Sequence, residues 1–195
     1  MTQDGGSSSN LPTASLKLDA ETLALIDTSK VKKLIGRLIV KAHERRAQTI
    51  AVLTWDNDDL AASTARIVAS ALSQQVDRRC ALISIEGIRF NCENYDALSV
   101  ITVPELELSM VTEQGAAFIN EINANYPFQV LIGPSIKSWN ELSVAKSRIV
   151  LNAGAHLLAV PASGVPRAAV ERIRRFTEEH KIKWLGTIAI EENKQ

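Results

Sequence analysis

The residues best placed for chemistry lie between Thr54 and Thr64, where the chain reads TWDNDDLAAST. An apolar run, Thr49 to Thr54, precedes this stretch, and a helical pattern follows it. A turn between a buried strand and a helix is a common place for nucleotide phosphates, because the free N–H groups and the dipole at the start of the helix attract anions. Ser63 and Thr64 are residue types that bind Mg²⁺ at such a site. The setting is therefore that of a nucleotide site.

The same stretch lacks the other parts of a phosphate loop. Such a loop needs glycines, so that consecutive N–H groups can curl around the β-phosphate, and a lysine that meets the β/γ charge. Ala62 stands at the lysine position, and Asp59 and Ala61 stand at glycine positions. Asp56, Asp58 and Asp59 add negative charge, and two like charges about 4 Å apart repel by roughly 4 kcal/mol at an effective dielectric near 20. We therefore expect no cofactor here, with Asp58 or Asp59 capping the helix as a built-in anion.

Other reactive side chains have ordinary structural explanations. Trp55 is too large for a phosphate loop, and we expect it to fill the vacant site, with an exposed interface anchor as the alternative. His43, His156 and His180 belong to different predicted elements, so we expect no metal site. No serine lies in a nucleophile-elbow pattern, so we expect no Ser-His-Asp arrangement. Cys80 falls in an apolar run that predicts a buried thiol. No catalytic residue is predicted.

Length and composition fit one domain with a tail. The chain has 195 residues, of which 46% are hydrophobic, and its 22 Lys and Arg residues equal its 22 Asp and Glu residues, so bulk charge does not indicate nucleic acid. Residues 1–15 are rich in Ser and Gly and predict a disordered tail, 16–48 an N-terminal helical segment, and 49–195 an α/β domain. No apolar run approaches the roughly 20 residues of a membrane span, and no secretory signal is seen, which predicts a cytoplasmic protein.

Residues Ser29 to Arg46 predict an amphipathic basic helix. The apolar positions at helical spacing are Val31, Leu34, Ile35, Leu38 and Ile39. The basic residues on its other faces are Lys30, Lys32, Lys33, Arg37, Lys41, Arg45 and Arg46. Two interpretations stay open, a solvated face or a contact with a partner or an acidic membrane surface.

Strands and helices then alternate along the chain. Strands are expected at Thr49–Thr54, Cys80–Ile85, Leu98–Val103, Phe128–Ile132, His156–Val160 and Trp184–Ile190. Helices are expected at Asp59–Val76, Val111–Asn125, Trp139–Asn152 and Pro166–Lys181. This alternation predicts an α/β fold, a doubly wound, mostly parallel sheet with helices on both faces in a Rossmann-like three-layer arrangement. Ligands in such sheets bind beyond the strand carboxyl ends, near residues 54–64, 84–90 and 133–139. Glu86, Arg89 and Glu93 lie near this crevice, where a solvated loop explains them without chemistry.

From Thr49 to about Ile190 the chain resembles the cytoplasmic kinase domain of bacterial exopolysaccharide tyrosine autokinases. These kinases lie within the wider family of partitioning-type ATPases with a deviant phosphate loop, so the resemblance implies a P-loop NTPase-like domain. Family members have a loop ending Gly-Lys-Ser-Thr, and here Ala61-Ala62-Ser63-Thr64 takes its place. Their second strand reads Arg-Val-Leu-Leu-Ile-Asp-Ala-Asp, matched by Arg79 to Glu86, and the stretch Ala153 to Val160 looks like a later family strand.

The departures from the family pattern concern catalysis. The second acidic motif would place aspartates at Ser84 and Glu86, and the family's Asp-Thr-Pro-Pro corresponds to a stretch ending Ile132-Gly-Pro-Ser135, without a carboxylate. Phosphoryl transfer depends on the charge clamp, the phosphate cradle and the metal support that are missing together. The resemblance therefore indicates vestigial nucleotide-binding positions at Asp58, Asp59, Ala62, Ser63, Thr64 and Glu86, without activity.

The resemblance implies work beside an inner-membrane polysaccharide co-polymerase or export protein, with self-association as a further possibility. We expect a pseudokinase that regulates or scaffolds polysaccharide synthesis and export, located in the cytoplasm or held at the inner membrane by that partner. One alternative is a tyrosine autokinase that still binds ATP and Mg²⁺ through Ser63, Thr64 and Glu86. Another is a localisation scaffold for a secretion or motility apparatus, with the basic helix as its contact.

Overall fold

The computed structural model describes residues 29–75, 79–86, 90–104 and 122–190. Several positions discussed above lie outside these ranges: the predicted tail, Val76, Arg89 and residues 111–121 of one expected helix. The N-terminal segment is described only from residue 29 onward. The domain boundaries stay a prediction.

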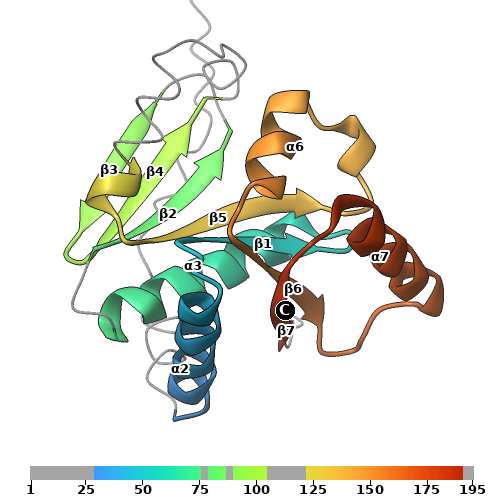
Figure 1. Ribbon diagram of the computed structural model, residues 1–195, viewed down its shortest axis with the longest axis horizontal. Helices are drawn as coiled ribbons and strands as arrows, with labels where there is room; N and C mark the ends of the chain where they lie inside the picture. The colour runs from blue at the N-terminus through green and yellow to red at the C-terminus, as the bar shows by residue number, and fades with distance from the viewer. Residues whose placement is uncertain (1–28, 76–78, 87–89, 105–121, 191–195) are drawn as a thin grey trace, which may run out of the picture.

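Within the described residues, seven strands form one sheet in the order β3-β4-β2-β5-β1-β6-β7 (Figure 1). The strands are β1 (Thr49–Thr54), β2 (Cys80–Ile85), β3 (Asn91–Tyr95), β4 (Leu98–Val103), β5 (Phe128–Ser135), β6 (Ala155–Pro161) and β7 (Trp184–Ile190). Every pairing is parallel except the one between β3 and β4. The prediction of a mostly parallel, doubly wound sheet is confirmed.

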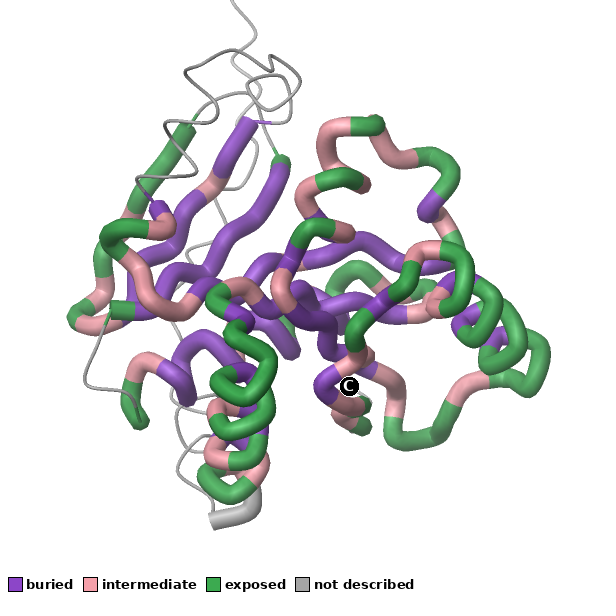
Figure 2. The backbone as a smooth tube through the Cα atoms, in the orientation of Figure 1, coloured by how far each residue is buried: buried purple, intermediate pink, exposed green. Residues whose placement is uncertain are grey.

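Helices cover both faces of the sheet. One face packs against α3 (Asp58–Gln75), with α2 (Ser29–Glu44) lying over α3 and β7. The other face packs against η1 (Trp139–Glu141), α6 (Val144–Leu151) and α7 (Arg167–His180). Figure 2 shows the central strands buried along most of their length. Strands covered on both faces need apolar side chains at nearly every position, which is why their sequences form continuous apolar runs.

Strand β3 was not predicted. It is polar and largely exposed, pairs only with β4, and reaches it through a two-residue turn in which Asp96 has a positive φ of 48°. Aspartate tolerates that conformation, so Asp96 is the sequence signal for the hairpin. Glu93 therefore lies in a strand, where its carboxylate accepts a hydrogen bond from the Tyr95 hydroxyl. This bond lowers the pKa of Glu93.

The expected helix at Trp139–Asn152 is wrong in its continuity. The chain makes a short 3-10 turn, η1, becomes extended at Leu142, and starts α6 anew. The Ser143 hydroxyl caps α6 by accepting a hydrogen bond from the Lys146 N–H at 3.1 Å. Serine is a strong N-cap residue, so it favours a new helix start over a continuous helix.

Candidate functional site

The connection between β1 and α3 is short. Only residues 55–57 separate the end of the strand from the first helical residue. The Asn57 side-chain oxygen accepts a hydrogen bond from the Leu60 N–H at 3.0 Å, which makes Asn57 the N-cap of α3. The Thr54 hydroxyl donates to the Asn57 carbonyl at 3.0 Å and tightens the turn. The expectation that Asp58 or Asp59 caps this helix is therefore wrong, because asparagine one residue earlier takes that position.

Asp58 has a different partner. Its carboxylate accepts a hydrogen bond from the backbone N–H of Ser135 at 2.7 Å, across 77 residues of sequence. Ser135 ends β5 and is only 5% exposed, so this bond ties the start of α3 to the neighbouring strand. Asp59 is also in the first turn of α3 but is exposed. A negative charge near the start of a helix is stabilised by the helix dipole. Here the Asp58 carboxylate supplies that charge, in place of a bound anion.

The remaining positions of the expected loop lie farther along the helix. Ser63 is the sixth residue of α3 and Thr64 the seventh, so Ser63 lies about 8 Å along the axis from the helix start. The Ser63 hydroxyl donates to the Asp59 carbonyl at 2.8 Å, and the buried Thr64 hydroxyl donates to the Leu60 carbonyl at 2.7 Å. Ala62 is half-buried on the same helix. The structure therefore places the Ser-Thr pair in the second turn of the helix.

Glu86 is not brought to the same point. It is exposed directly after β2, and its N–H bonds to the carbonyl of Val103 at 3.1 Å. Strand β5 lies between β1 and β2, and adjacent strands are about 4.8 Å apart, which puts the end of β2 roughly 10 Å from the end of β1. Glu86 and the start of α3 share one edge of the sheet but not one site.

The segment after β5 closes over the end of β1. The Ile136 N–H donates to the Thr54 carbonyl and the Lys137 N–H to the Trp55 carbonyl, each at 2.9 Å. Gly133 permits this approach, because a Cβ at that position would lie 2.6 Å from the Val52 carbonyl oxygen. The sequence placed residues 54–64 and 133–139 at one edge, and the structure brings them into direct contact. The sequence did not predict Asn57 as the N-cap of α3 or the bond between the Asp58 carboxylate and the Ser135 N–H.

Trp55 lies half-buried against the cluster on the α7 side of the sheet. The Arg172 guanidinium carbon lies 5.9 Å from the centre of its ring, within the range of a cation–π contact. Its backbone and ring thus join β1, the segment after β5 and α7. This half-buried position fits the filling role expected from the sequence better than it fits an exposed interface anchor.

The residues at the start of α3 do not fit a magnesium-bound triphosphate. The connection of three residues carries no glycine and no lysine, so it cannot wrap a chain of N–H groups around a phosphate. The Asp58 carboxylate adds a negative charge beside the helix start and is held there by the Ser135 N–H. An arriving phosphate would meet that charge, which favours a site that recognises no nucleotide.

Titratable groups elsewhere are structural. Burial raises the pKa of the Cys80 thiol to about 12, which keeps it protonated and inert. Burial lowers the pKa of His156 below its ordinary value, although its Nε2–H donates to the Val150 carbonyl at 2.8 Å. His43 lies on α2 and His180 on α7 against Trp139. In the described ranges, no three His, Cys, Asp or Glu residues gather closely enough to hold a metal ion.

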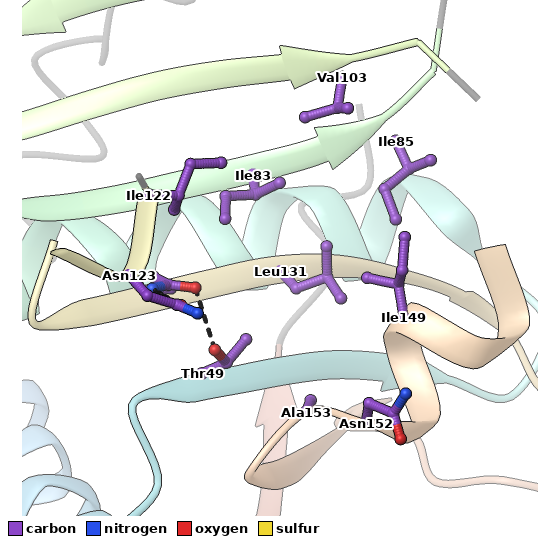
Figure 3. Close-up of a pocket in the computed structure, with 11 residues that line it drawn as sticks. Thr49, Ile83, Ile85, Val103, Ile122, Asn123, Leu131, Ile149, Asn152 and Ala153 are labelled. Carbon is purple, nitrogen blue, oxygen red and sulfur yellow. Dashed lines mark hydrogen bonds between the residues drawn. The ribbon is translucent and has the colours of Figure 1, made fainter. Parts of the chain in front are cut away.

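A cavity of about 280 Å³ lies on the sheet face that α6 covers and reaches Ile85 and Val103 at the carboxyl ends of β2 and β4 (Figure 3). Its walls are mainly apolar, and at one end Thr49, Gln129 and Asn123 form a chain of hydrogen bonds of 3.0 and 2.7 Å. Val103 and Ile122 both line it, and residues 105–121 between them lie outside the described part of the chain. The cavity brings no titratable side chain together with the start of α3.

Comparison with known proteins bears on the fold. No family model matches the chain, and no curated protein matches it. Among solved structures, the BceF tyrosine kinase domain matches with a TM-score of 0.61 at 11% identity, over 81% of this chain and 74% of that one. The VpsO kinase domain matches with a TM-score of 0.64 at 12% identity, over 89% and 97% of the two chains. The chimerical protein CapA2B2 matches with a TM-score of 0.68 at 12% identity, over 89% and 92%.

The chain shares the fold of the BceF and VpsO kinase domains. This confirms, at the level of the fold, the resemblance that the strand order and the residues 61–64 and 79–86 indicated. At 11 and 12% identity the likeness shows the fold alone. In this chain the contact between Asp58 and Ser135 lies at the carboxyl edge of the sheet, where open α/β sheets bind their ligands. None of the helices that the structure describes is long and apolar enough to cross a bilayer.

Proposed function

We propose that the chain is a catalytically inactive kinase-like domain that regulates or scaffolds the synthesis and export of an envelope polysaccharide. The observation that carries this proposal is the bond between the Asp58 carboxylate and the Ser135 N–H. It holds an anion of the protein beside the helix start that would have to receive a phosphate. A domain fixed in this way would keep a single conformation, whereas a nucleotide-dependent relative would switch between two.

The partner in this proposal is an inner-membrane polysaccharide co-polymerase or export protein, and a second copy of the chain is a further candidate. Support comes from the fold shared with the BceF and VpsO kinase domains and from the sequence resemblance to polysaccharide autokinases. The domain would work in the cytoplasm, docked on its partner without a nucleotide cycle. Its folded surface would bind the partner without ATP or Mg²⁺.

Calorimetry with ATP and Mg²⁺ tests the inactive part of the proposal. We expect no binding up to millimolar nucleotide and no phosphate release. Micromolar binding that a Ser63→Ala substitution abolishes would contradict it and favour an atypical autokinase. The matched control is Ser73→Ala, because Ser73 also donates its hydroxyl to a carbonyl of α3 but lies near the far end of the helix.

Complementation tests the scaffolding part. In a strain that lacks the chain, we expect less exported polysaccharide, and we expect a Ser63→Ala/Glu86→Gln variant to restore it as fully as the unmodified chain. That variant removes two of the three groups through which a metal could be held, and the third, the Thr64 hydroxyl, is buried and bonded to the Leu60 carbonyl. Failure of this variant, with normal protein levels, would show that a metal-dependent activity is needed. Unchanged polysaccharide in the deletion strain would contradict the assigned process.

A further inference from the structure

The outer face of α2 carries positive charge that the fold itself does not use. The buried side of this helix, Ile35, Leu38 and Ala42, is at most 3% exposed and packs into the core. The Lys41 ammonium donates to the Leu185 carbonyl at 2.9 Å and so fastens the helix to β7. The direction of α2 on the domain is therefore fixed, and its opposite side faces outward (Figure 2).

Lys33, Arg37 and Val40 follow one another at positions i, i+4 and i+7, which puts them on a single face of the helix. Lys33 and Arg37 are exposed, and Val40 is 57% exposed, one of the few large apolar side chains on the described surface to be so open. Among the residues that the structure describes, no ion pair involves Lys33 or Arg37. Glu44, the only acidic residue of α2, is four residues after Val40 and seven after Arg37, so it lies at the end of the same face and lowers the net charge there.

Further basic residues flank this face. Exposed Lys32 lies on one side of it, and Arg45 and Arg46 follow directly after Glu44. From Lys33 to Val40 this face covers seven residue steps, about 10 Å along the helix axis. An exposed basic face attracts anionic lipid headgroups, and an exposed apolar side chain beside the charges can insert among them.

We infer that α2 binds an anionic lipid surface through Lys33, Arg37 and Val40, with the helix axis parallel to the membrane. Lipid phosphates would neutralise the basic side chains, and Val40 would insert among the headgroups. This inference goes beyond the proposed function, because it gives the domain a membrane contact of its own without a protein partner.

Two other anionic partners fit the face less well. From Val31 to Glu44 the helix has no Phe, Tyr or Trp and no Ser, Thr, Asn or Gln, so apart from its Lys and Arg residues and His43 it carries no side chain that stacks on bases or reads their edges. Lysine is depleted in protein–protein interfaces, and one exposed valine makes no apolar interface core. A lipid surface needs neither, since it binds by diffuse charge and shallow insertion.

Vesicle sedimentation of the full chain tests the inference. The probes are vesicles with about one third phosphatidylglycerol and vesicles of phosphatidylcholine alone. We expect binding to the anionic vesicles only. Each Lys or Arg near such a surface strengthens binding about fivefold, so Lys33→Gln/Arg37→Gln should weaken it about 25-fold. Val40→Ser should weaken it several-fold.

The matched control is Arg148→Gln/Arg175→Gln, which removes the same charge from exposed positions on α6 and α7, across the sheet from α2. It should bind within twofold of the unmodified chain. All substituted residues are exposed, and equal melting temperatures would verify that the variants fold. Any of four results would overturn the inference. The first two are an equal loss of vesicle binding in both double variants and unchanged vesicle binding of Val40→Ser. The other two are equal binding to anionic and neutral vesicles, and stronger binding to duplex DNA than to vesicles. Vesicle binding and ATP calorimetry are separate measurements, so this inference and the proposed function can fail independently.

Discussion

Replacing Asp58 tests whether its carboxylate holds the edge of the sheet together. In Asp58→Ala the buried Ser135 N–H loses its acceptor, and a hydrogen bond to a charged group contributes about 1.5–3 kcal/mol. The carboxylate also interacts with the helix dipole, which contributes about 0.3–1 kcal/mol. Because Asp58 itself is exposed and water can reach the vacated position, we expect the lower end of these ranges, a loss of about 2 kcal/mol in the free energy of unfolding.

Asp59→Ala is the matched control. Asp59 lies in the same helical turn and is exposed, and its side chain has no partner among the described residues, so only the dipole contribution of about 0.3–1 kcal/mol is lost. Asp58→Asn keeps an oxygen acceptor and loses the charge, so its loss should lie between the two. Urea denaturation at constant pH, followed by circular dichroism, measures all three variants.

The expected order of destabilisation is Asp59→Ala, then Asp58→Asn, then Asp58→Ala. The step from Asp59→Ala to Asp58→Ala should exceed 1 kcal/mol, well outside the error of a denaturation midpoint. Equal, small losses for both alanine variants would refute the reasoning, because they would show that the bond to Ser135 contributes nothing beyond the dipole. The observation that supports the proposed function would then lose its energetic basis.

Three further predictions concern the core. Gly133→Ala should destabilise the fold by about 1–3 kcal/mol, because the new Cβ would lie 2.6 Å from a carbonyl oxygen of β1. Gly36→Ala should instead stabilise α2 by about 0.5–1 kcal/mol, because a Cβ there would have no atom within 4 Å. Thermal denaturation compares the two variants. Burial lowers the pKa of His156 in the folded chain, so the unfolded chain binds more protons below about pH 6.5. Its contribution to stability is therefore complete above that pH and falls, by up to about 1.4 kcal/mol per unit, as the pH drops; His156→Gln should flatten this slope in urea titrations between pH 7 and about 5.5. A thiol reagent should modify exposed Cys92 at once and buried Cys80, whose pKa is about 12, only in denaturant; rapid modification of both in the native chain would contradict this burial.

The sheet could be predicted because most of its strands are covered on both faces. Burial on both faces demands an apolar side chain at nearly every position, and that leaves a strong local pattern in the sequence. Strand β3 left no such pattern, because it lies at the edge and only Tyr95 of this strand packs against the core. Only its turn residue, Asp96, carries a local signal, and one residue is a weak basis for a hairpin.

The details of the candidate site depend on contacts that no local pattern encodes. Asn57 and Asp58 are both acceptable N-cap residues, so sequence alone does not decide between them. The choice is made by Ser135, whose N–H approaches from another strand, 77 residues away, and takes the Asp58 carboxylate. Similarly, the break before α6 follows from the extended conformation at Leu142 and the cap at Ser143, which override a continuous helical periodicity.

The chain departs from a phosphate loop in geometry as much as in residue type. A lysine introduced at Ala62 would stand on the fifth residue of a formed helix, about 6 Å along the axis from its start. The three residues before the helix would still be too few to surround a phosphate, and the Asp58 carboxylate would still lie beside the helix start. Because strand and helix are joined this closely, the connection that contacts β5 is also too short to surround a phosphate. The contact with β5 and the lack of a phosphate cradle thus have one structural cause, the short connection between β1 and α3.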